Sequence, residues 1–135
     1  MKTYCEIYRV QASDLDFLGH VNNKAYLSWM EQVAWHHAQA VGINQELQRK
    51  LNRILAVHEH HMQYQASCYE HDEIELKTWV GQPIGCCQRE RFFEFRRLKD
   101  QKIVFSAQSL YVCISLDNHK ARRIPTAFID PYWNS

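Results

Sequence analysis

A short segment near the start of the chain gathers residues that could do chemistry. Within ten residues it holds two carboxylates, a glycine, a histidine and two asparagines: Asp14, Asp16, Gly19, His20, Asn22 and Asn23. A helical pattern follows directly, so a polar loop leads into a helix N-terminus. The free N–H groups and partial positive charge of a helix start can polarise a carbonyl oxygen and stabilise an oxyanion. We therefore expect a candidate active site here, with Asp16 beside an electrophile.

Asp16 suits such a site because a carboxylate is ionised at neutral pH and can act as a nucleophile or a general base. Spacing alone leaves a second interpretation open, in which Asp14 and Asp16 bond the backbone and shape the loop. Asp14 is assigned this structural role. Gly19 is expected to allow close approach of a ligand or a positive φ, or to be an ordinary turn glycine. His20 can bond substrate, hold the loop or donate to Asp16.

Other polar clusters are interpreted as structural. In the run from His58 to His61, alternate side chains on a strand face opposite sides, so Glu59 and His61 share one face and no third metal ligand converges. The pair His36–His37 is predicted to lie at the surface or at an interface. The basic side chains available for a phosphate are interpreted as solvated charge, and none is assigned a role: Arg89, Arg91, Arg96, Arg97, Lys120, Arg122 and Arg123.

Size and composition narrow the class of protein. A chain of 135 residues fits a single domain, residues 1–135. Lys plus Arg is 16 and Asp plus Glu is 15, so no basic surplus indicates a nucleic-acid partner. Five cysteines, with no Cys-x-x-Cys spacing, favour a reducing cytoplasm over a disulfide framework or a zinc site. No run resembles a signal peptide or reaches the length of a membrane span, which predicts a soluble intracellular protein.

The elements that position the polar loop follow from periodicity. Alternation over residues 3–12 predicts a first strand. Asn22 or Asn23 is expected to cap a helix over 25–41. Its apolar stripe is centred on Leu27, Met30, Ala34, Ala38 and Val41 and is widened by Tyr26, Trp29, Val33 and Trp35. Gly42 is expected to end that helix, and Asn44 to cap a second one over 45–51, in which Glu46 and Lys50 would pair. Further strands are predicted at 54–66, 73–82, 86–98 and 102–116.

Turn signals at Gly81–Gly85 and Leu98–Gln101 indicate hairpins, so the sheet should be mostly antiparallel. One strand, one long helix and four strands give an α+β layout. The tail containing Phe128 and Tyr132 is expected to be packed.

The motif Asp14-x-Asp16-x-x-Gly19-His20-Val21-Asn22-Asn23-x-x-Tyr26, followed by an aromatic-rich helix with Glu31, resembles the signature of the hotdog-fold acyl-CoA thioesterases. This group is named after 4-hydroxybenzoyl-CoA thioesterase. Further marks come in the family order and extend the resemblance over nearly the whole chain: Glu59, Tyr64, Asp72 and Val112 to Asp117.

The resemblance implies a hotdog fold, in which a curved, mostly antiparallel five-stranded sheet wraps around a long central helix. It also implies hydrolysis of an acyl-CoA or acyl carrier protein thioester by Asp16, with the Asn23 backbone N–H bonding the thioester oxygen. Gly19, His20, Val21 and Glu59 are the other residues that it places at the substrate. No metal or redox cofactor is implied, coenzyme A being part of the substrate, and relatives form homodimers or homotetramers.

Two alternatives stay open. A hotdog-fold hydratase or dehydratase would act on the same thioesters but uses an Asp and His or a His and Glu pair that is set differently. A non-catalytic acyl-CoA-binding subunit would keep the fold without the reaction, although the presence of Asp16 and the loop from Gly19 to Asn23 argues against it.

Overall fold

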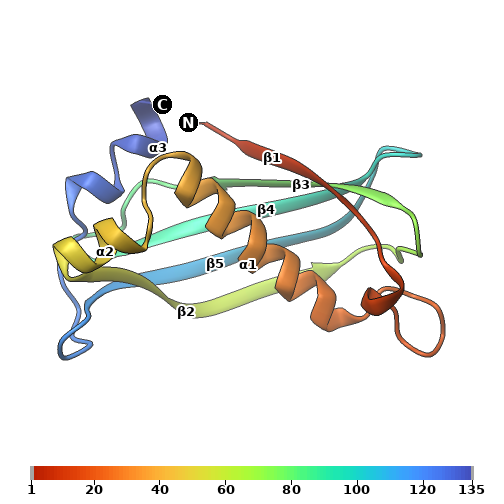
Figure 1. Cartoon of the computed structure of the whole chain (residues 1–135), viewed down its shortest axis with the longest axis horizontal. Coiled ribbons are helices and arrows are strands. Elements are labelled where there is room, and N and C mark those ends of the chain that lie inside the picture. The colour runs from red at the N-terminus through yellow and green to blue at the C-terminus, as the bar shows by residue number, and fades with distance from the viewer. Residues whose placement is uncertain (1, 135) are drawn as a thin grey trace.

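The computed structural model describes residues 2–134 and contains a five-stranded sheet with one long helix across it (Figure 1). The strand order is β1-β3-β4-β5-β2, and every neighbouring pair is antiparallel. The strands are β1 (Tyr4–Arg9), β2 (Arg53–Tyr64), β3 (Glu73–Val80), β4 (Gln88–Arg97) and β5 (Lys102–Ser115). The helices are α1 (Asn23–Ala40), α2 (Gln45–Leu51) and α3 (Pro131–Asn134), with 3₁₀ turns η1 (Ala12–Asp14) and η2 (Thr126–Phe128). The predicted α+β layout and its antiparallel sheet are confirmed.

Helix α1 lies across the curved sheet (Figure 1) and buries an aromatic stripe against it. The helix residues that are buried are Ala25, Tyr26, Trp29, Met30, Val33 and His37. The predicted apolar face is confirmed for Tyr26, Trp29, Met30 and Val33. Leu27 and Ala34 are only half-buried. Rings bury more apolar area than the smaller residues do, so Tyr26 and Trp29 occupy the deep positions among the sheet's phenylalanines.

The ends of both main helices follow the sequence signals. Asn22, not Asn23, is the N-cap of α1, because its side chain accepts the Lys24 N–H at 2.8 Å. After Val41, Gly42 takes a φ of +87°, the left-handed conformation that glycine adopts without strain. Asn44 caps α2 by accepting from Leu47 N at 2.9 Å. The expected Glu46–Lys50 pair is not among the ion pairs of residues 2–134.

Two predictions about polar side chains were wrong. Arg89 and Arg91 were interpreted as solvated, yet only 1% and 5% of their surface is exposed. His37, predicted to lie at the surface or at an interface, is 3% exposed on the buried side of α1. The inward face of β4 reads Arg89, Arg91, Phe93, Phe95, so the arginines share the face of the buried rings.

The C-terminal tail closes one end of the sheet. Phe128 and Tyr132 are buried in a second cluster with Ile43 and Val80, as expected for a packed tail. Within residues 2–134, no helix is both long and apolar enough to cross a membrane.

Candidate active site

The polar loop between β1 and α1 is held by Asp14. Its carboxylate accepts the Tyr8 hydroxyl at 2.7 Å and the Gln11 N–H at 2.9 Å, while its carbonyl accepts the Asn22 N–H at 2.7 Å. Asp14 thus fastens the loop to β1 on one side and to the start of α1 on the other. This is the structural role expected of it.

Asp16 closes the next turn of the loop through one carboxylate oxygen. Oδ1 accepts the backbone N–H groups of Leu18 at 2.9 Å and His20 at 3.2 Å. Its backbone N–H donates to the His20 carbonyl at 2.8 Å. Within residues 2–134 no donor reaches Oδ2, so one oxygen orients the side chain and the other is left for chemistry. The loop-shaping and catalytic interpretations of Asp16 are therefore compatible.

Gly19 supplies the backbone conformation of this turn. Its φ is +83°, and nothing within 4 Å would obstruct a Cβ at this position. The requirement for glycine is therefore conformational rather than steric, because L residues rarely adopt this φ.

The first turn of α1 offers a backbone donor. The Asn22 side chain accepts the Lys24 N–H, and the Asn22 carbonyl accepts the Ala25 N–H. The Asn23 N–H is at the first helical position, where no intrahelical acceptor exists, and in the described chain no side chain takes it. An N–H group there, at the positive end of the helix, suits a developing oxyanion.

These groups open into one cavity of about 360 Å³. On the loop and α1 side it is lined by Asp16, His20, Val21, Asn23 and Tyr26, and on the other side by residues 64–67. Four of the six predicted site residues are thus brought together: Asp16, His20, Val21 and Asn23. Burial is the main cause that raises the pKa of Tyr26, so its phenol stays protonated and polar at the inner end.

The structure places the other two predicted residues differently. Gly19 shapes the loop without lining the cavity. Glu59 is on β2 beside an irregularity in its pairing with β5, its carboxylate 3.3 Å from His61 Nε2, and it does not line the cavity either. Among residues 2–134, no three His, Cys, Asp or Glu side chains are grouped to hold a metal ion.

The ring of His20 packs edge-on against Tyr69, with centroids 5.3 Å apart. It is the backbone N–H of His20, not its imidazole, that donates to Asp16. Of the three roles left open for His20, its main chain performs the loop-holding one, and the residue also lines the cavity.

Sequence reasoning missed the far wall of the cavity, made by Gln65, Ala66 and Ser67 at the end of β2. Backbone pairing holds this segment, since Gln65 N and Ala66 N both donate to the Val104 carbonyl. The available signal was that this segment directly follows Tyr64, one of the further residues that carry the family resemblance.

Comparison with known proteins bears on the whole chain. A family model described as the thioesterase-like superfamily matches residues 10–131. No sequence among curated proteins matches significantly.

Three solved structures show the likeness in fold. Slr0204, a 1,4-dihydroxy-2-naphthoyl-CoA thioesterase from Synechocystis, has a TM-score of 0.88 at 14% identity, over 98% of this chain and 97% of that one. SAV2348 from Staphylococcus aureus, in complex with CoA, has a TM-score of 0.88 at 13% identity, over 96% of this chain and 81% of that one. The 12:0-ACP thioesterase from Umbellularia californica has a TM-score of 0.86 at 19% identity, over 98% of this chain and 51% of that one. This chain therefore spans about half the length of that thioesterase. The chain therefore has the fold of these three structures.

Proposed function

Because the chain belongs to the thioesterase-like superfamily and has the hotdog fold, we propose that it hydrolyses acyl thioesters to a free acid and a thiol. One observation carries the proposal. The Asp16 carboxylate and Asn23, whose N–H starts α1, line the same cavity. A thioester carbonyl placed between them would have an attacking group and a hydrogen-bond donor, the two things that acyl transfer needs.

Asp16 supplies the attack through Oδ2. As a nucleophile it forms an anhydride with the acyl group and expels the thiolate, and water then releases the acid. As a general base it removes a proton from water, whose oxygen attacks the carbonyl carbon. In both routes the carbonyl oxygen becomes negative, and the Asn23 N–H stabilises it. A burst of thiol before the steady state marks the first route. Neither route requires a metal or redox cofactor.

The substrate we propose is an acyl-CoA or an acyl carrier protein thioester. The support is the chemistry named for the similar structures, two of which carry CoA in their descriptions and one an acyl carrier protein. The chain's net charge of +1 favours neither carrier. Thiol release from a panel of aromatic and aliphatic acyl-CoAs, with matched acyl carrier protein substrates, separates these classes.

We also propose a homodimer or homotetramer. Strand β2 is at an edge of the sheet and carries the exposed side chain of Val57. In the loop beside the cavity, 95% of the surface of Phe17 is exposed. An open edge and an exposed ring are features that a second copy would cover. Light scattering coupled to size exclusion measures the mass in solution, and a monomer at micromolar concentration contradicts this proposal.

Asp16→Asn tests the function directly. The amide keeps the size of the side chain and an oxygen that can accept from Leu18 N and His20 N, but removes the negative charge. We expect thiol release to fall at least about 100-fold, the usual contribution of a positioned base. Asp130→Asn changes an exposed carboxylate that does not line the cavity and serves as the control. Parent-like rates for Asp16→Asn across the panel would refute the mechanism.

Product analysis distinguishes the alternatives. A hydratase or dehydratase changes the acyl chain without releasing a titratable thiol. An acyl-binding subunit binds acyl-CoA and leaves it intact.

A further inference from the structure

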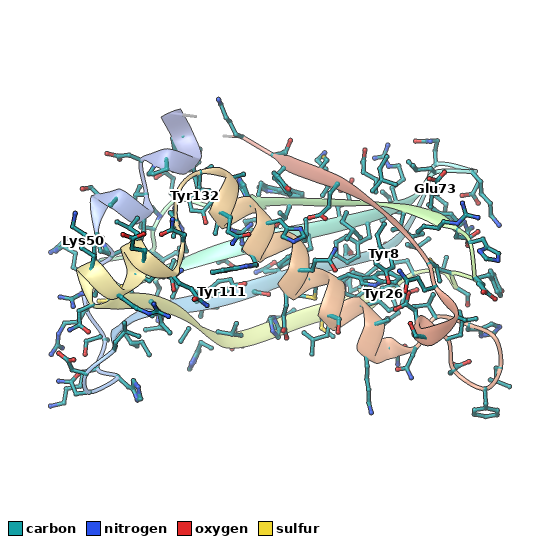
Figure 2. All side chains as sticks on the ribbon, in the orientation of Figure 1. Tyr8, Tyr26, Lys50, Glu73, Tyr111 and Tyr132 are labelled. Atoms are coloured by element: carbon teal, nitrogen blue, oxygen red, sulfur yellow. The ribbon has the colours of Figure 1, made fainter. Side chains whose placement is uncertain are left out.

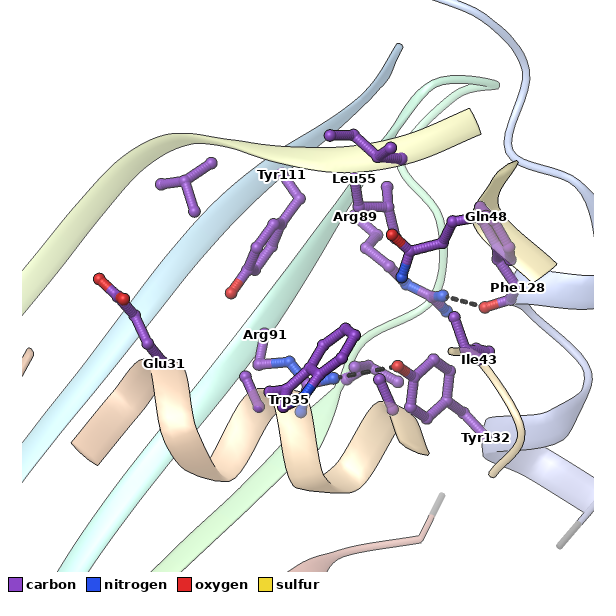
Figure 3. A pocket seen from close by; sticks show the side chains of 15 residues that line it. Glu31, Trp35, Ile43, Gln48, Leu55, Arg89, Arg91, Tyr111, Phe128 and Tyr132 are labelled. Atoms are coloured by element: carbon purple, nitrogen blue, oxygen red, sulfur yellow. Dashed lines mark hydrogen bonds between the residues drawn. The ribbon is translucent and has the colours of Figure 1, made fainter. Parts of the chain in front are cut away.

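A second cavity, of about 290 Å³, is at the other end of α1 (Figure 3). Its walls come from the later turns of α1, from β2, β4 and β5, and from the C-terminal tail. It shares no lining residue with the cavity at Asp16. In Figure 2, Tyr26 of the first cavity is near the start of α1, while Tyr111 and Tyr132 of the second are toward its other end.

Two buried arginines line this second cavity. Arg89 donates to the Phe128 carbonyl at 2.6 Å and to the Gly81 carbonyl at 3.3 Å, and its Nε has no partner among the described residues. Arg91 donates to Thr78 Oγ1 at 3.1 Å and to the Tyr132 hydroxyl at 3.2 Å. Both guanidinium groups also lie over the Tyr132 ring, at 5.3 and 5.6 Å. Within residues 2–134, no carboxylate is within 4.0 Å of either arginine.

The third partner of Arg91 is also uncharged. His37 Nδ1 is 2.9 Å from Arg91 Nη1, and arginine can only donate, so Nδ1 accepts and its proton is on Nε2. Burial, with a smaller effect of the Arg91 charge, lowers the pKa of His37 to about 4. The ring is neutral at physiological pH, which leaves two positive charges side by side with no countercharge from a bonded neighbour.

Such an arrangement is costly unless something neutralises it. A buried charge is tolerated in proteins when it is paired, and two like charges in one cavity raise the cost. Each guanidinium keeps N–H groups beyond those used by its neutral partners, since arginine has five donors. An anion in the cavity would meet these donors and supply the missing charge.

We propose that this cavity is a binding site for a small amphipathic carboxylate, with its anionic group at Arg89 and Arg91 and its apolar body against the remaining walls. Those walls are largely apolar and aromatic: Trp35, Ile43, Leu55, Val80, Tyr111 and Phe128. The volume is roughly twice the ~150 Å³ of a cavity that accommodates benzene. It suits a body of one or two rings or a medium-length chain. A planar carboxylate, with its two oxygens, matches the paired N–H donors of a guanidinium group better than a spherical anion does.

Glu31 lines the same cavity and is the chain's own candidate for the countercharge. It is exposed, and its carboxylate does not come within ion-pair distance of Arg91. If Glu31 competes with the ligand, Glu31→Gln binds a carboxylate more tightly than the parent. If Glu31 does not compete, Glu31→Gln binds the carboxylate with the affinity of the parent. Weaker binding by Glu31→Gln contradicts the arrangement.

Calorimetric titration of the full chain with octanoate and with 2-naphthoate tests the proposal. We expect saturable binding of at least one of them, with octanamide, which lacks the charge, bound at least tenfold more weakly. Ala34→Phe places a ring in the cavity from α1, leaves both arginines in the sequence, and should abolish binding. Ala40→Phe, on the exposed end of the same helix, is its matched control and should bind as the parent does.

Arg91→Met removes one charge and should weaken octanoate binding at least tenfold while leaving that of octanamide unchanged. The site is independent of thioester chemistry, so Asp16→Asn should bind octanoate as the parent does. Absence of saturable binding for both acids, equal binding of octanoate and octanamide, or binding that survives Ala34→Phe would overturn the proposal. None of these results bears on thiol release at Asp16.

Discussion

Asp16 and His20 are joined twice, because the Asp16 N–H donates to the His20 carbonyl at 2.8 Å and the His20 N–H donates to Asp16 Oδ1 at 3.2 Å. The pair closes a five-residue loop on itself before α1 begins. The carboxylate is thereby oriented by local backbone, and the distance from it to the helix start depends on a short and well-bonded segment.

Asn23→Pro, compared with Asn23→Ala, should distinguish the contribution of the backbone N–H from that of the side chain. Proline lacks the N–H but suits the first helical position, and Asn22 already has the extended conformation (φ −67°, ψ 142°) that a following proline requires. We expect thiol release to fall about 100- to 1,000-fold, the usual cost of losing one oxyanion donor. Asn23→Ala keeps the N–H and should remain near the parent rate. Equal rates for the two variants would exclude the proposed donor.

Gly19→Ala should strain the loop. A φ of +83° costs an alanine about 1–2 kcal/mol, and no neighbour within 4 Å adds a clash. We expect lower thiol release and a lower midpoint in urea unfolding. Gly19→Asn should be milder, since asparagine tolerates the left-handed region better. The opposite order of the two variants would show that backbone conformation is not what this position requires.

Tyr8→Phe removes the hydroxyl that donates to the Asp14 carboxylate at 2.7 Å. Hydrogen bonds to charged groups are worth about 1.5–3 kcal/mol, so we expect the free energy of unfolding to fall by about that amount. Tyr69→Phe, on an exposed tyrosine whose ring contact with His20 is kept, is the control. Urea unfolding of both variants gives the comparison. A loss of the same size in both would remove the special role of Asp14.

His37 should make stability depend on pH. The folded state holds its pKa at about 4, whereas an unfolded histidine titrates near 6.5. Between these values the unfolded chain binds the extra proton, so stability falls as the pH drops from about 6.5 to about 4 and His37 has no further effect below that. The full effect is about 3 kcal/mol.

His37→Gln, which retains an acceptor for Arg91, should flatten this dependence between pH 7 and pH 4.5. His58→Gln, on an exposed histidine of β2, should not. Unfolding free energies measured at several pH values for the three proteins decide the matter. An unchanged slope in His37→Gln would assign the dependence to other groups.

The sequence predicted those features that depend on local patterns. Asn22 and Asn44 are caps, Gly42 follows the end of α1, and the strands lie within a few residues of the expected ranges. Each of these is determined by residues close in the chain, whose side chains bond nearby N–H groups or whose backbone adopts a special φ. Asp16, His20, Val21 and Asn23 were expected together for the same reason, since all four belong to one loop and its helix.

Features that depend on contacts between distant segments were predicted less well. Residues 65–67 face Asp16 because β2 ends beside the start of α1, which no local pattern reveals. The buried state of Arg89 and Arg91 depends on the tail folding over β4, since their partners Phe128 and Tyr132 come about 40 residues later. Arg91 and Arg89 precede Phe93 by two and four residues, so the alternation of a strand puts them on the same face as that buried ring. Their charge nevertheless favoured the interpretation as solvated side chains.

The inward face of β4 is not uniform along its length, and this limits how the sheet can assemble. A strand with only apolar inward residues can slip by two positions and still bury an apolar face. Here a slip of two would move Arg91 to the position of Phe93, opposite Ala107, and Phe93 to that of Phe95. Phe95 itself would leave its stacked position on Phe105. The two arginines therefore also help to fix the register of β4, because a slip by two residues would place a charge among the aromatic rings.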